Sequence, residues 1–150
     1  MLAANHTVVA GVVGSYFGNP FLAFLIGIII HFILDAVPHY DTTDNGKITF
    51  RQMVLVIVDF LIGLFIVFYI MHVKLSFGSP FVWGAIGGNL PDIFDNVPFW
   101  NENFRRTKIG KRIHNFHELI HSKVFDRKPV LGLLSQYLII ALFIWIYFTK

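Results

Sequence analysis

The chain has 150 residues, of which 55% are hydrophobic and only 14% are charged. Soluble domains carry about 25% charged residues, and one soluble domain of this length could not bury so much apolar surface. With 17 Phe, no Cys and a mean hydropathy of +0.64, the composition excludes a disordered chain, a collagen-like repeat and a disulfide scaffold, and it indicates a helical membrane protein.

Five segments are predicted to cross the membrane, each of which needs about 20 mostly apolar residues at full length. In chain order they are 2–18, 20–37, 53–71, 77–92 and 130–148. The first and fourth are rich in glycine, whose lack of a side chain lets helices pack closely inside a bilayer. We therefore predict an all-α polytopic membrane protein with about five transmembrane helices, forming a single membrane-embedded domain over 1–150.

Basic residues fall almost entirely on one side of these spans. Of the 12 Lys and Arg, only Lys74 and Lys150 lie on the side opposite the start of the chain. Short loops rich in Lys and Arg stay in the cytoplasm. We therefore expect a prokaryotic inner or plasma membrane, with the N-terminus in the cytoplasm and the C-terminus outside. All carboxylates, and every histidine except His72, fall toward the cytoplasmic side.

Residues 19–41 and 79–101 resemble each other at a fixed offset of 60 positions. Each segment has Pro near its start and Asp-x-Val-Pro near its end. Both are predicted to run toward the cytoplasmic side, so we interpret them as a parallel internal repeat about an axis along the membrane normal. Because sites in repeat-built membrane proteins lie between the repeats, we expect Asp35 and Asp95 to face each other at the cytoplasmic surface.

Histidine and aspartate side chains from five parts of the chain are predicted to meet at this surface. Ionisable residues within a membrane are energetically costly, so they are functional candidates by default. Imidazole and carboxylate without thiolate suit zinc, manganese or a related divalent ion. We expect one or two ions, with zinc preferred. The candidate ligands are His6, His31, Asp35, His39, Asp41, Asp92, His117 and His121.

Two further residues are expected to support the ligands. Asp59 lies about two turns inside the third predicted span, and His114 lies one turn before His117. Outer hydrogen-bond partners orient metal-binding histidines. We assign this role to both residues, with direct metal binding by Asp59 as the alternative.

The segment after the fourth span is predicted to form an amphipathic helix, about 104–126, on the cytoplasmic membrane surface. Apolar residues recur there at helical spacing, and histidines occupy an adjacent arc. The remaining face carries Lys and Arg, so the basic segment 105–128 is expected to contact anionic lipid headgroups. Membrane lipids are therefore the expected partners, and no nucleic-acid partner is expected. The apolar stripe consists of Ile109, Ile113, Phe116, Ile120 and Val124.

The pentapeptide His117-Glu118-Leu119-Ile120-His121 matches H-E-x-x-H. In that motif two histidines one turn apart bind one zinc ion and the glutamate acts as general base. Glu118 is therefore a candidate base, and Asp95 is a second candidate if it does not bind metal. This motif also keeps an alternative function open, an intramembrane zinc metalloprotease.

Taken together, these motifs resemble the YdjM-like family of inner-membrane metal-dependent hydrolases. The chain places its His-x-x-x-Asp element before the paired histidines, whereas that family places it after them. The resemblance implies a membrane-bound hydrolase that uses a metal. The matching elements are His6, His31 with Asp35, Leu90-Pro91-Asp92 with Asp95, and His117 with His121-Ser122.

We therefore predict a membrane-bound, metal-dependent hydrolase with its site at the cytoplasmic membrane face. Because that site lies at headgroup depth beside a basic surface, a phosphoester in a lipid or an amphiphile is the expected substrate class. A non-enzymatic metal-binding anchor or partner-binding protein is a further alternative. A metal carrier is disfavoured, because the spans offer almost no polar residues toward the outer side.

Overall fold

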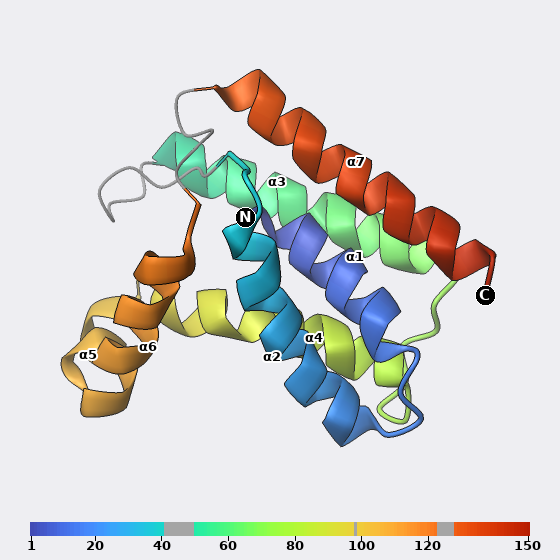
Figure 1. Cartoon of the computed structure of the whole chain (residues 1–150), viewed down its shortest axis with the longest axis horizontal. Helices are drawn as coiled ribbons and strands as arrows, with labels where there is room; N and C mark the ends of the chain where they lie inside the picture. The colour runs from blue at the N-terminus through green and yellow to red at the C-terminus, as the bar shows by residue number, and fades with distance from the viewer. Residues whose placement is uncertain (41–49, 98, 123–127) are drawn as a thin grey trace.

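The structure is a computed structural model that describes residues 1–40, 50–97, 99–122 and 128–150, and within these ranges every regular element is helical (Figure 1). The prediction of an all-α chain is confirmed. Asp41, one of the predicted ligands, lies outside the described residues. The elements are α1 (Ala3–Gly14), α2 (Pro20–Ala36), α3 (Phe50–Phe65), the π-helical turn η1 (Ile66–Ile70), α4 (Pro80–Asp95), α5 (Asn101–Arg106), α6 (Lys108–Ile120) and α7 (Pro129–Phe148).

Two helical segments are long and apolar enough to cross a membrane. They are Gln52–Ile70, in α3 and η1, and Val130–Phe148, in α7, and most of their residues face outward. The other predicted spans form shorter helices, with 12 residues in α1, 17 in α2 and 16 in α4. At 1.5 Å per residue, α1 is about 18 Å long, against about 30 Å for the hydrocarbon core of a bilayer. The five-span topology therefore remains a proposal.

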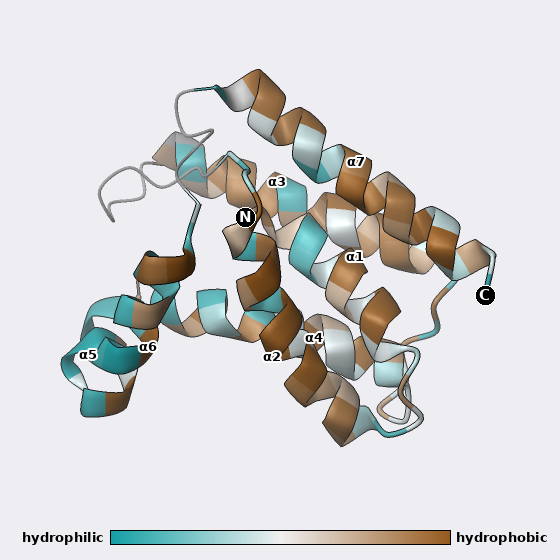
Figure 2. Cartoon of the chain, viewed as in Figure 1, coloured by the Kyte–Doolittle hydropathy of each residue, from teal (hydrophilic) through white to brown (hydrophobic). Residues whose placement is uncertain are grey.

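α1 lies inside the bundle, with α2, α3, α4 and α7 packed around it (Figure 1). Apart from Ala3 and Val13, all of its residues are buried. Protein rather than lipid surrounds this helix, so bilayer thickness does not set its length. The outer helices α2, α3 and α7 consist mostly of apolar residues, drawn in brown in Figure 2. This arrangement places His6, on α1, in the interior of the protein.

Glycines let α1, α2 and α4 approach one another backbone to backbone. A Cβ built on Gly27 of α2 would lie 3.0 Å from the amide nitrogen of Gly88 on α4. A Cβ built on Gly88 would lie 2.7 Å from the carbonyl oxygen of His6 on α1. Any larger residue would push these backbones apart. The glycine contacts thus bring the polar residues of three helices within reach of one another.

The two predicted repeat helices, α2 and α4, pack against each other and end at the same site. Each has Pro in its first turn, where the missing N–H costs no hydrogen bond. Near their ends, Asp35 and Asp95 contact the two nitrogens of one imidazole, that of His117. The two carboxylates are therefore neighbours in space. The symmetry axis of the repeat stays a prediction.

The single amphipathic helix predicted over 104–126 is instead two helices, α5 and α6. Thr107 is extended (φ −73°, ψ 153°), which ends α5, and its Oγ1 then caps α6 by accepting a hydrogen bond from Gly110 N at 2.9 Å. α6 ends at Ile120, because His121 leaves helical geometry with ψ 121°. Residues 123–127 lie outside the described part of the chain.

Candidate metal centre

Helices α2, α4 and α6 bring polar side chains together where α2 and α4 end. α2 supplies His31 and Asp35, α4 supplies Asp92, and α6 supplies His117. One ligand atom from each of these four residues lies within 4.8 Å of the other three. His31 and Asp35 are fully buried, and His117 is nearly so. Four metal-binding groups thus share one interior point.

The spacing of these atoms fits a tetrahedral divalent ion. Bonds of about 2.1 Å to such an ion separate its ligands by about 3.4 Å. Asp35 Oδ2 lies 3.1 Å from His31 Nε2 and 2.7 Å from His117 Nε2. Asp92 Oδ1 lies 3.8 Å from each of the same two nitrogens. These separations lie on both sides of the tetrahedral value, so small side-chain adjustments would suffice.

Hydrogen bonds at the far nitrogens turn the imidazoles toward this point. His31 Nδ1 lies 2.8 Å from the carbonyl oxygen of Gly88, which can only accept, so Nδ1 carries the proton. In the neutral ring, Nε2 then presents a lone pair to Asp35, and within the described residues it has no hydrogen-bond partner. A lone pair facing a carboxylate needs a cation or a proton between them. This pattern is typical of metal-binding histidines.

His117 repeats the arrangement from another helix. Its Nδ1 lies 3.2 Å from Asp95 Oδ2, and its Nε2 faces Asp35. Burial lowers the pKa of His117, but the hydrogen bonds to Asp35 and Asp95 outweigh burial and raise the pKa to about 10. The two carboxylates therefore favour positive charge at this point, as a cation would supply.

His6 lies beside the four residues and extends their donor set. Its ring stacks on that of His31, with centroids 4.2 Å apart, and it is fully buried. Its Nε2 lies 3.3 Å from Asp35 Oδ1 and 3.8 Å from Asp92 Oδ2. In the described structure neither ring nitrogen has a hydrogen-bond partner. The amino group of Met1 also contacts Asp35 Oδ1, at 2.6 Å.

A second group of possible ligands, Asp35, His39 and His121, overlaps the first. His39 Nδ1 lies 2.7 Å from the carbonyl oxygen of Val37, so its Nε2 presents a lone pair to His121 Nε2 at 3.1 Å. Burial lowers the pKa of His39 to about 3, which keeps this imidazole neutral. Asp35 belongs to both groups, so its carboxylate could bridge two ions.

The H-E-x-x-H match does not present its histidines as a zinc protease would. His117 belongs to the first group and His121 to the second, and the centroids of their rings lie 5.8 Å apart. Glu118 is exposed on α6, and neither group found in the described part of the chain includes it. The geometry thus gives the protease alternative no support.

Asp95, expected as a catalytic base, lies behind His117 instead of in the four-residue group. His114 Nδ1 lies 3.0 Å from the same Oδ2 atom, and Arg105 Nε donates to Oδ1 at 2.8 Å. Burial raises the pKa of Asp95, but hydrogen bonds from His117, His114 and Arg105 outweigh it and hold the pKa well below its usual range. An ionised carboxylate in this place orients His117. His114 contacts the site through Asp95.

Asp59, the other predicted supporting residue, holds a backbone group. Its carboxylate accepts a hydrogen bond from Ala4 N at 2.7 Å, at the start of α1.

Sequence reasoning missed Gln136, which is fully buried on α7. Its side chain accepts a hydrogen bond from Leu2 N and donates one to the carbonyl oxygen of Tyr40. A glutamine inside an otherwise apolar span was the signal that could have identified it.

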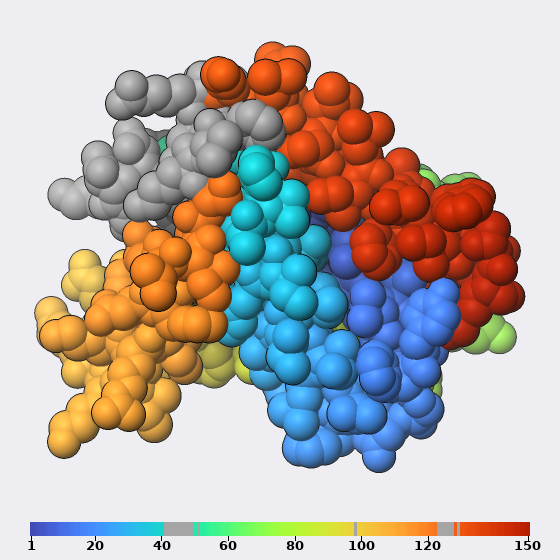
Figure 3. All heavy atoms as spheres, viewed as in Figure 1, coloured from blue at the N-terminus to red at the C-terminus, as the bar shows by residue number. Residues whose placement is uncertain are grey.

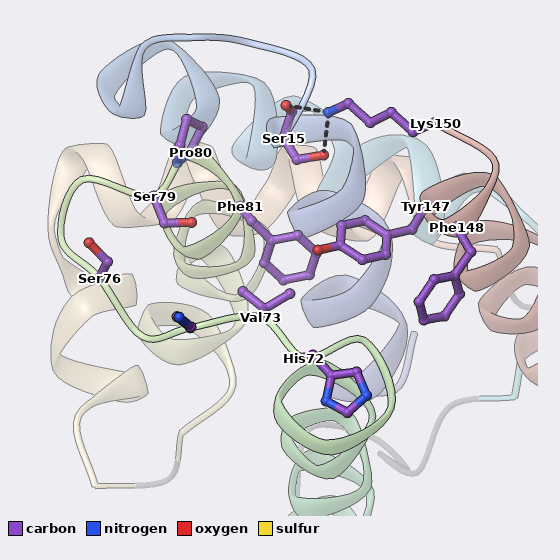
Figure 4. Close-up of a pocket in the computed structure, with 11 residues that line it drawn as sticks. Ser15, His72, Val73, Ser76, Ser79, Pro80, Phe81, Tyr147, Phe148 and Lys150 are labelled. Carbon is purple, nitrogen blue, oxygen red and sulfur yellow. Dashed lines mark hydrogen bonds between the residues drawn. The ribbon is translucent and has the colours of Figure 1, made fainter.

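A hollow of about 600 Å³ lies where α1 and α7 end, and Figure 4 shows the residues that line it. His72 lines it, apart from the other histidines, and Lys150 Nζ reaches the carbonyl oxygen of Ser15 at 2.7 Å. No carboxylate and no second histidine are among its lining residues. This hollow therefore lacks the groups that a metal centre needs.

Comparison of the chain with protein-family models, curated proteins and solved structures finds no match in any of the three. The geometry of the side chains is therefore the basis for a function.

Proposed function

We propose that the protein is a membrane-bound, metal-dependent hydrolase of the kind that the YdjM-like motifs suggest. The observation that carries the proposal is the orientation of three imidazoles. His31, His39 and His117 each anchor Nδ1 on a carbonyl or carboxylate oxygen and turn Nε2 toward another metal-binding group. Such a set, without thiolate, suits zinc first.

The residues divide into holding and positioning roles. His31, Asp35, Asp92 and His117 would hold one ion, and His39 and His121 would hold a second that shares Asp35. Asp95 would fix the ring of His117. When bound, such an ion supplies a Lewis acid for the bond under attack and acidifies a water molecule.

Substrate would approach from the side of Asp92. Its side chain is 26% exposed, whereas those of His31, Asp35 and His117 are 0–5% exposed. A basic helix pair, α5 and α6, lies next to this end of the bundle (Figure 2). A phosphoester in a membrane lipid or an amphiphile fits both features.

The test combines metal analysis with hydrolysis. Protein purified in lipid nanodiscs should bind about one or two zinc ions and release phosphate from short-chain phosphatidic acid. Asp35→Asn should lose both metal and activity, whereas the matched variant Asp59→Asn should keep its metal. Metal without hydrolysis of any phosphoester would indicate the non-enzymatic anchor, and equal metal content in Asp35→Asn and the unmodified protein would refute the centre.

For the membrane topology, we propose five crossings, with the short helix α1 packed among α2, α3, α4 and α7. The chain has no cysteine, so single cysteines can report sidedness. Cysteines in place of Glu102 and Thr149 should be labelled from opposite sides, with Glu102 on the cytoplasmic side. Labelling of both from one side would contradict five crossings.

A further inference from the structure

We infer that α6 docks on an anionic bilayer surface and that this docking completes the metal centre through His117. The inference rests on the metal centre proposed above and names how lipid would regulate it. In the described structure, the outward face of α6 exposes large apolar residues.

Large apolar side chains on α6 point away from the bundle. Ile109 is 70% exposed and Leu119 is 82% exposed, whereas Phe116, at 48%, packs in part against Phe32 of α2. With 13 residues, about 20 Å, α6 is too short to cross a bilayer. A short helix with a strongly apolar stripe and a charged remainder typically lies in the membrane interface.

The charges beside this stripe select an anionic surface. Lys108, Lys111 and Arg112 are exposed on the same helix. At 100° per residue, Lys108 lies about 20° beyond Leu119 around the axis and so borders the apolar face, whereas Arg112 lies within that face, about 60° from Ile109. Basic residues at the edge of an interfacial helix contact lipid phosphates while the apolar residues enter the acyl region. The partner that fits is therefore a bilayer rich in anionic lipid.

In the described part of the chain, polar side chains supply much of the contact between α6 and the bundle. His117 contacts Asp35 and Asp95, and His114 contacts Asp95. The ring of Phe116 packs edge-on against Phe32, with centroids 5.0 Å apart. α6 lies along α2 at the edge of the molecule, orange beside cyan in Figure 3. These contacts leave Ile109 and Leu119 exposed, so a bilayer that covers them would add to the interactions that hold α6 in place.

His117 transmits that position to the metal centre. It lies two residues from Leu119, so at 100° per residue the two side chains project about 160° apart. Insertion of the outer face into a bilayer therefore presses the inner face, with His117, toward Asp35. Two binding events that favour the same arrangement strengthen each other by typically 5–150-fold. We expect zinc to bind at least about fivefold more tightly in anionic than in neutral bilayers.

A fluorescence experiment measures directly whether α6 enters the bilayer surface. Ile109 and Glu118 project about 180° apart at 100° per residue, and both are exposed. Each is replaced by cysteine, labelled with an environment-sensitive fluorophore, and placed in nanodiscs of phosphatidylcholine with or without 30% phosphatidylglycerol. The probe at Ile109 should shift to the blue in the anionic discs, and the probe at Glu118 should not. A probe at Ile109 that stays aqueous in anionic discs overturns the docking.

A metal titration in the same two nanodiscs tests the coupling. The double variant Ile109→Ser/Leu119→Ser should lose the lipid dependence of zinc affinity, whereas the matched variant Leu138→Ser, on an exposed site of α7, should retain it. Equal zinc affinity in both discs, with docking observed, overturns the coupling. No zinc binding in either disc overturns the metal centre and its coupling together, while the fluorophore still decides the docking.

Discussion

Replacing Asp95 with Asn should weaken zinc binding by close to 100-fold, although Asp95 itself lies outside the four-residue group. Changes to the outer partner of a metal-binding histidine cost 10–100-fold in affinity, or about 1.4–2.7 kcal/mol. The contact of Arg105 with Asp95 places this variant at the upper end of that range of affinity loss. Arg105 Nε donates to Oδ1 of Asp95 and would keep the oxygen of the new amide on its own side. The amide NH₂ would then face His117 Nδ1 and force the tautomer whose Nε2 carries a proton into the site.

The assay is a competition of zinc against a fluorescent chelator, with the protein in anionic nanodiscs. The double variant Asp95→Asn/Arg105→Met frees the amide to rotate its oxygen toward His117, so it should recover part of the lost affinity. Asp59→Asn should bind zinc like the unmodified protein, because Asp59 contacts Ala4 N instead of a ligand. Unchanged affinity in Asp95→Asn, or no recovery in the double variant, would refute the assignment of Asp95 as the residue that orients His117.

Three further predictions follow from the packing and from the exposure of the acidic residues. Gly88→Ala should lower the free energy of unfolding by about 1–3 kcal/mol, because the added Cβ overlaps α1. Gly18→Ala should leave the free energy of unfolding unchanged, because the space around Gly18 is open. The midpoint of chemical denaturation in detergent distinguishes the two variants. Glu118→Gln should reduce phosphoester hydrolysis less than Asp92→Asn, because Glu118 is exposed, and the reverse order with metal retained would favour the protease. Zinc at about 100 times its dissociation constant should stabilise the protein by about 2.7 kcal/mol, measured by thermal unfolding, and removal by a chelator should reverse this; the same gain in Asp35→Asn would contradict the site.

The composition and the local spacing of residues were enough to predict an all-helical chain, its two long apolar helices and most of the candidate ligands. These features depend on residues close together in the sequence. An apolar run of 19 residues makes a helix long enough to cross a membrane wherever it packs. The spacing of His31 and Asp35 likewise puts both on one helical face before any tertiary contact forms.

Only the tertiary structure decided how those faces combine. The glycine contacts of α2 and α4 set the distance between His6 and His31, and no local pattern reports a contact between distant segments. His117 contacts Asp35 and Asp95 whereas His121 contacts His39, although the spacing of the two histidines alone suggested one shared ion. Asp95 was expected as a catalytic base, but its carboxylate forms hydrogen bonds with Arg105 and His114 instead. Local spacing determines which side chains share a helical face, whereas the packing of backbones determines which faces meet.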